Sequence, residues 1–128
     1  HCTWEGITCH TEGEFNGLVR KIELDDNNLV GTADLVTIWL LQGLEVLRLQ
    51  KNKVFVPFLN IENAINLRTL IISETKTNSL IGIGGAKQLR ELHVTNAGLQ
   101  GMIPDELFQL SLLEKLYLSH NALTGFLP

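Results

Sequence analysis

Cys2 and Cys9 are the two cysteines of this 128-residue chain, and they stand seven positions apart near its start. A metal site needs three or four ligands, so a single pair of thiols is poor metal chemistry. The spacing also differs from the Cys-x-x-Cys of redox motifs. We favour a small structural disulfide formed in an oxidising compartment. Two reduced, buried thiols are the alternative.

A glycine-rich segment at residues 82–87, Gly-Ile-Gly-Gly-Ala-Lys, has the composition of a phosphate-binding loop. It lacks the third glycine of the dinucleotide-binding fingerprint and the Gly-Lys-Ser/Thr ending of the nucleotide-triphosphate loop. Asp105 and Glu106 follow Pro104 and are typical of the acidic start of an outer turn. We therefore expect neither segment to bind a phosphate or to catalyse a reaction.

Composition and charge exclude several classes of protein. Ten basic and fourteen acidic residues give a net charge of −4, which argues against a nucleic-acid partner. Apolar residues make up 45 % of the chain, as in an ordinary globular protein, and the length allows one domain with a modest core. No apolar run approaches the roughly 20 residues that span a bilayer, so no transmembrane segment is expected.

A repeat of apolar residues organises the chain from about Leu18 onward. The pattern Leu-x-x-Leu-x-Leu, with Ile or Val at some positions, recurs five times at offsets of 25, 23, 22 and 24 residues. Its apolar–polar alternation predicts a short strand in each unit, and stacked units would share one core beneath a parallel sheet. We expect five strands centred on nearly fully buried residues: Ile22, Leu47, Leu70, Leu92 and Leu116.

Asparagines follow three of these strands at the same phase: Asn27, Asn52 and Asn121. An asparagine that points inward there can bond to the backbone of its own coil and of its neighbour, which satisfies otherwise unpaired peptide groups. The same position holds Thr75 in the third repeat and Ala97 in the fourth. We therefore expect the asparagine ladder to fail there, with Thr75, Asn96 or water as substitutes.

These motifs resemble the leucine-rich repeat, over about Leu18 to Pro128. Residues 99–104, Leu-x-Gly-x-Ile-Pro, and residues 118–128, Leu-x-x-Asn-x-Leu-x-Gly-x-Leu-Pro, are similar to the plant type. Residues 2–9 resemble that family's N-terminal cap, Cys-x-Trp-x-Gly-x-x-Cys. The resemblance implies an α/β solenoid: a right-handed superhelix with a parallel β-sheet on the concave face and a mostly irregular or short helical convex face.

The same resemblance implies how the chain is divided. Residues 1–17 would form a disulfide cap, in which the Cys2–Cys9 bridge and Trp4 seal the end of the solenoid. Residues 18–128 would form about five repeats, the last of them incomplete and exposing a core edge that further repeats or a partner would cover. The second and third repeats depart from the Gly-x-Ile-Pro pattern, with Phe58-Leu59 and Ser79 in its place. We expect their outer face to be irregular.

The repeat phase also fixes which residues face outward from the sheet. One column joins an aliphatic and two aromatic side chains across three consecutive strands, namely Ile71, His93 and Tyr117. We expect a partner to bind there, with Arg48 and Glu91 at the rim, because exposed apolar and aromatic groups are typical of interface anchors. Incidental packing between strands is the alternative.

Other outward positions suggest less. Alternating charges predict surface ion pairs, between Glu23 and Arg48 and along Asp26, Lys51 and Glu74. His93 and His120 could approach each other on adjacent strands, but no acidic third ligand is in phase with both, so we expect no metal. The neighbouring serines, Ser73 and Ser119, offer no catalytic triad because an open sheet lacks an oxyanion pocket. We expect no catalysis and no cofactor.

Taken with the resemblance, these observations predict a recognition module that binds a protein or peptide, or a glycan, on its concave face. A receptor-like ectodomain or a secreted inhibitor-like protein would carry it, outside the cell or at its surface. The lumen of an organelle or secretory compartment is the alternative location. The alternative function is that of a structural subunit docked permanently in a larger protein assembly.

Overall fold

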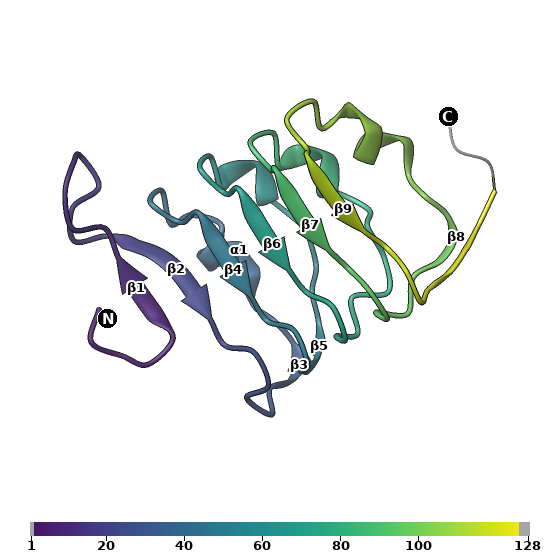
Figure 1. The fold of residues 1–128 in the computed structure, drawn as a ribbon, viewed down its shortest axis with the longest axis horizontal. Helices are drawn as coiled ribbons and strands as arrows, with labels where there is room; N and C mark the ends of the chain where they lie inside the picture. The colour runs from purple at the N-terminus through teal and green to yellow at the C-terminus, as the bar shows by residue number, and fades with distance from the viewer. Residues whose placement is uncertain (1, 126–128) are drawn as a thin grey trace.

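The computed structural model describes residues 2–125 and shows a stack of coils, one for each repeat (Figure 1). Six strands form the large sheet, in the order β1-β2-β4-β6-β7-β9. They are β1 (Ile7–Cys9), β2 (Val19–Glu23), β4 (Val46–Arg48), β6 (Thr69–Ile71), β7 (Glu91–His93) and β9 (Lys115–Tyr117). From β2 to β9 all neighbours are parallel, and the five predicted central residues lie opposite one another in register. The predicted repeat phase is confirmed.

Burial follows the repeat except in the last coil. Ile22, Leu47, Leu70 and Leu92 are buried, as predicted, in one continuous apolar core. Leu116 is 38 % exposed, so the expectation of near-complete burial is wrong for this residue. The reason is its place in the sheet: β9 is the last strand in the order, and among residues 2–125 no further strand lies beside it.

The cap is a hairpin rather than another coil. β1 pairs antiparallel with β2, and the Cys2–Cys9 disulfide forms, with a Cα–Cα separation of 5.5 Å. The side chain of Trp4 is 65 % exposed. The expectation that Trp4 seals the end of the solenoid is therefore wrong, and the β1 backbone covers the edge of the first coil instead.

Two short sheets and a row of tight turns complete the coils. One sheet pairs β3 (Val30–Thr32) with β5 (Lys53–Phe55), and the other pairs β8 (Gln100–Met102) with β10 (Ala122–Thr124). The outer turns are α1 (Leu35–Ile38), η1 (Ile61–Asn63), η2 (Ile83–Gly85) and η3 (Asp105–Gln109). The second and third repeats each carry a 3₁₀ turn, so their irregularity lies elsewhere. The third coil has β6 in the large sheet but no second short strand, so the short sheets of β5 and β8 are not joined.

The asparagine ladder forms at two of its three predicted positions. The Asn52 side chain is buried and donates to the carbonyl oxygens of Leu24 and Leu49, at 2.9 Å each. Its Oδ1 accepts the backbone N–H groups of Asn27 and Leu29, at 3.0 Å each. Asn121 bonds to the preceding coil in the same way. Its amide donates to the carbonyl of Val94, and its Oδ1 accepts the backbone N–H groups of Ala97 and Leu99.

The expectation that the ladder holds at Asn27 is wrong, and Asn96 does not act as a ladder residue either. The Asn27 side chain is exposed and donates to the carbonyl of Asp25 in its own coil, because no earlier repeat lies beside it to be bonded. In the third coil Thr75 donates to the carbonyl of Ile72 at 2.6 Å, as predicted. In the fourth coil Asn96 is exposed, and the N–H of Thr95 is instead accepted by the hydroxyl of Ser73.

A left-handed turn residue follows each repeat strand. These five residues have φ between 52° and 60°: Asp26, Lys51, Glu74, Asn96 and His120. The backbone N–H of each of the first four donates to a carbonyl of the next coil, as from Lys51 to Ser73 at 3.1 Å. The predicted ion pairs along Asp26, Lys51 and Glu74 are absent from the part of the chain that the structure describes.

Candidate binding face

His93 and Tyr117 form an aromatic pair on the outward face of the large sheet. They lie opposite each other on β7 and β9, and their ring centroids are 4.4 Å apart with planes tilted by 50°. Tyr117 is 49 % exposed, so much of its ring is open to a partner. Aromatic rings at this distance and tilt attract each other, which fixes the pair as a unit.

Ile71 lies beside this pair but is not an exposed anchor. It is opposite His93 in register and only 7 % exposed. The expectation of an exposed apolar run across three strands is therefore wrong at its first member. Its neighbours in register are Arg48 on one side and His93 on the other. Ile71 is placed to act as the floor of the face.

Glu91 holds the imidazole of His93. The two side chains point to the same side of β7, two residues apart, and His93 Nε2 donates to Glu91 Oε2 at 2.7 Å. This contact orients the ring that packs on Tyr117. Glu91, His93 and Tyr117 are thus brought together by the structure, as the repeat phase predicted.

Arg48 belongs to a separate polar cluster nearer the cap. Its Nη2 lies 2.8 Å from Asp25 Oδ2, and its Nε lies 3.0 Å from the same oxygen. Gln50 donates to Asp25 through its backbone N–H and its side-chain amide, at 3.2 Å each. Arg48 therefore pairs with Asp25, so the predicted pair of Glu23 and Arg48 is wrong. Asp25 and Gln50 occupy the same position in consecutive repeats, so the repeat phase places them side by side and could have predicted their contact.

The glycine-rich segment has a packing role. A Cβ on Gly84 would lie 2.8 Å from the Cβ of Glu106, so a glycine lets η2 approach η3 closely. The backbone N–H of Gly84 donates to Glu106 Oε1 at 2.8 Å. A phosphate at this N–H would have to displace the Glu106 carboxylate. Glu106 therefore has a packing role between η3 and η2.

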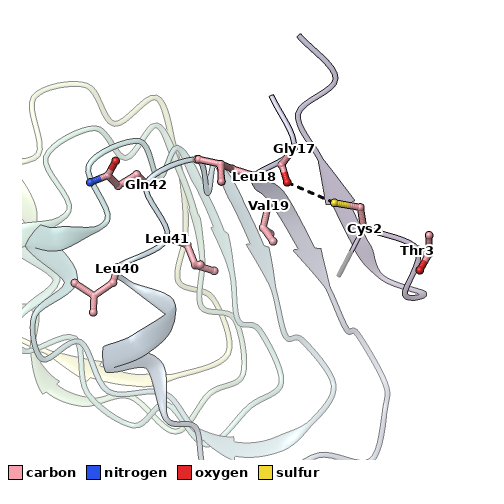
Figure 2. Close-up of a pocket in the computed structure, with 9 residues that line it drawn as sticks. Cys2, Thr3, Gly17, Leu18, Val19, Leu40, Leu41 and Gln42 are labelled. Carbon is pink, nitrogen blue, oxygen red and sulfur yellow. Dashed lines mark hydrogen bonds between the residues drawn. The ribbon is translucent and has the colours of Figure 1, made fainter. Parts of the chain in front are cut away.

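A hollow between the cap and α1 is apolar and has a volume of about 670 Å³ (Figure 2). Leu18, Leu40 and Leu41 line it, and none of its lining residues is charged. The Cys2 Sγ lies 3.6 Å from the carbonyl oxygen of Gly17 on one wall, but a disulfide sulfur has no hydrogen to donate. The hollow therefore offers little to orient a substrate.

Neither a metal-binding cluster nor a membrane-spanning helix occurs in residues 2–125, the described part of the chain. No cluster of three or more histidine, cysteine, aspartate or glutamate side chains is arranged to hold a metal ion there. No helix in this range has the length and apolar character needed to cross a bilayer.

Comparison with known proteins identifies the fold. The Leucine Rich Repeat family model matches residues 112–128. A chain in the crystal structure of the BIR3–SERK2 complex from Arabidopsis thaliana is similar over 98 % of this chain and 67 % of its own length, with a TM-score of 0.85 and 27 % identity. This chain has a leucine-rich-repeat fold.

Two further similarities come from the same plant. Pollen receptor-like kinase 2 is 28 % identical over 99 % of this chain, which spans 19 % of that protein. The leucine-rich-repeat ectodomain of the receptor kinase GASSHO1/SCHENGEN3, solved in complex with CASPARIAN STRIP INTEGRITY FACTOR 2, is 25 % identical with a TM-score of 0.77. That match covers 99 % of this chain and 18 % of the ectodomain chain. The neighbours of this chain are thus receptor-like ectodomains.

Proposed function

We infer that this leucine-rich-repeat chain is a receptor-like recognition module, which binds a protein or peptide outside the cell on the outward face of its large sheet. The observation that carries this proposal is the half-exposed ring of Tyr117 packed on His93. Two structural neighbours were solved as complexes, which supports a protein or peptide as the class of partner. The disulfide supports an oxidising location such as the cell exterior.

The geometry favours binding because the face is already ordered. Glu91 fixes the ring of His93, and Asp25 fixes the guanidinium of Arg48, so little side-chain freedom is lost when a partner docks. Tyr117 combines a large apolar ring with a hydroxyl that can still form a hydrogen bond, as interface anchors commonly do. In this proposal Tyr117 and His93 form the centre, Ile71 the floor, and Glu91 and Arg48 the rim.

A display selection tests the proposal. Random linear peptides on phage are selected against the immobilised chain, and the affinity of each enriched peptide is then measured by calorimetry. The Tyr117→Ala variant should bind these peptides about tenfold more weakly, because truncation of a central anchor typically costs more than about 1 kcal/mol. Its melting temperature should be nearly unchanged, since the side chain lies outside the core.

Phe108 provides the matched control for this experiment. It is an exposed aromatic residue on η3, on the outer side of the coils, and Phe108→Ala should leave the peptide affinity unchanged. Enriched peptides that bind Tyr117→Ala as tightly as the unmodified chain would show that the binding face lies elsewhere.

A further inference from the structure

Exposed apolar side chains gather on a second surface, on the flank of the solenoid. Leu59, Ile81 and Met102 are exposed by 68 %, 69 % and 70 %, and Phe55 is also exposed. Soluble proteins seldom leave several large apolar side chains together in water unless the surface binds something. We call this surface, together with the hollows between these residues, the flank groove.

Two hollows form the flank groove, and they share lining residues. One has a volume of about 410 Å³ and lies between the second and third coils, where Phe55 and Leu59 line it. The other, of about 150 Å³, lies between the third and fourth coils beside Met102. Asn78, Ser79 and Ile81 line both of them. The two hollows therefore lie on either side of the same segment of the third coil, and together they span the second, third and fourth coils.

The groove exists because the third coil departs from the repeat. Asn78 has a φ of 52°, and the N–H of Ser79 turns back to the carbonyl of Thr77 at 2.7 Å. The chain cannot run as a strand through that turn, so the short sheets β3-β5 and β8-β10 stay separate. The second repeat places Phe58 and Leu59 where the plant-type pattern has Ile-Pro, and Leu59 points into solvent.

Charge around the groove is sorted by position. No charged residue lines either hollow. Lys53 and Lys76 border the side nearer the large sheet: Lys53 projects from the same face of β5 as Phe55, and the Lys76 Nζ lies 5.8 Å from the Phe55 ring centroid. Neither lysine has an ion-pair partner among residues 2–125. Toward the convex side, Asp34 follows the lining residue Thr32 by two positions, and Asp105 directly follows the lining residue Pro104.

We propose that the flank groove binds an extended protein segment that carries aliphatic side chains and one or more carboxylates. The aliphatic side chains would cover Leu59, Ile81 and Met102. The carboxylates would lie at the side of the groove that Lys53 and Lys76 border, and the acidic convex side would reject them, which sets the direction of the segment. This site is separate from the face around Tyr117.

The test is a peptide selection against a chain in which the Tyr117 face has been disabled by substitution. Random linear peptides on phage are selected against the full chain carrying Tyr117→Ala and His93→Ala. The enriched sequences should combine aliphatic residues with aspartate or glutamate. Their affinity should fall about tenfold in the variant Leu59→Ser/Ile81→Ser, which removes apolar contact from exposed positions. The affinity of these peptides should also fall in the variant Lys53→Glu/Lys76→Glu. Their binding to the selected chain should weaken as the salt concentration is raised.

The matched control for this selection is the variant Ile65→Ser. Ile65 is exposed to a similar degree on the outer side of the coils, away from both hollows, so Ile65→Ser should have no effect. The proposal is overturned if the chain with the disabled Tyr117 face enriches no peptides, or if the peptides bind Leu59→Ser/Ile81→Ser normally. It is also overturned if sedimentation shows that the groove pairs two copies of this chain. None of these results bears on the Tyr117 face, which the earlier selection tests.

Discussion

At the scale of single residues, Asn52 links the backbones of the first two coils. Its amide makes five hydrogen bonds, and all of them go to backbone groups of the first two coils. These peptide groups lie near the core, where an unpaired donor or acceptor is costly. A buried amide at this position is therefore part of the backbone's hydrogen bonding rather than of the binding face.

Replacing Asn52 by alanine should lower the free energy of unfolding by about 1–3 kcal/mol, since several buried partners lose their bonds at once. Urea titration followed by circular dichroism measures this change. Asn27→Ala is the matched control, because the exposed Asn27 bonds only within its own coil, and it should cost clearly less. Equal losses in the two variants would contradict the ladder.

The left-handed turn residues are a second feature at this scale. Lys51 has a φ of 60° and carries a Cβ, a combination that costs energy for residues other than glycine. Lys51→Gly should therefore stabilise the chain by about 0.5–1 kcal/mol, measured by the same titration. Arg68→Gly, at a position where φ is not positive, should destabilise it. If Lys51→Gly is the more destabilising of the two, the turn geometry is wrong.

At the scale of the elements, each short strand depends on the strands on both sides. β7 lies between β6 and β9, and its central residue Leu92 is fully buried. β9 has a neighbour on one side, so Leu116 remains partly exposed. The same residue type at the same repeat phase should therefore contribute different amounts to stability.

Leu92→Ala should lower the free energy of unfolding by about 2–5 kcal/mol, through lost apolar burial and the cavity left behind. Leu116→Ala should cost less, because part of the Leu116 side chain is already in water. Thermal and urea unfolding of the two variants under identical conditions would show the difference. A larger loss in Leu116→Ala would mean that the core does not follow the repeat.

The sequence predicted those features that depend on the repeat period. The register of Ile22, Leu47, Leu70 and Leu92 and the bonds of Asn52 follow directly from positions that recur. Features set by long side chains were harder to predict. The phase gives the side to which Ile71 points, but its burial depends on the conformations of the surrounding side chains, which the repeat period does not fix. The antiparallel β1 lies outside the repeat, so the period carried no information about it.

At the scale of the whole molecule, the repeat presents two surfaces with different chemistry. The large sheet offers a face whose polar groups pair with one another, with Tyr117 as its open aromatic group. The flank offers an apolar groove that arises where the third coil fails to continue the short sheet. A stack of coils can bind one partner on its strands and another on its flank, because the surfaces are formed by different parts of each repeat.

The central claim is that a partner docks on the large sheet at Tyr117. Site-directed photo-crosslinking tests it most directly, with benzoylphenylalanine placed at Tyr117 in one sample and at Phe108 in another. A peptide selected against the unmodified chain should crosslink from position 117, since its bound side chains would lie against that ring. It should not crosslink from position 108, on the outer side of the coils. Crosslinking from position 108 with none from position 117 would contradict the account.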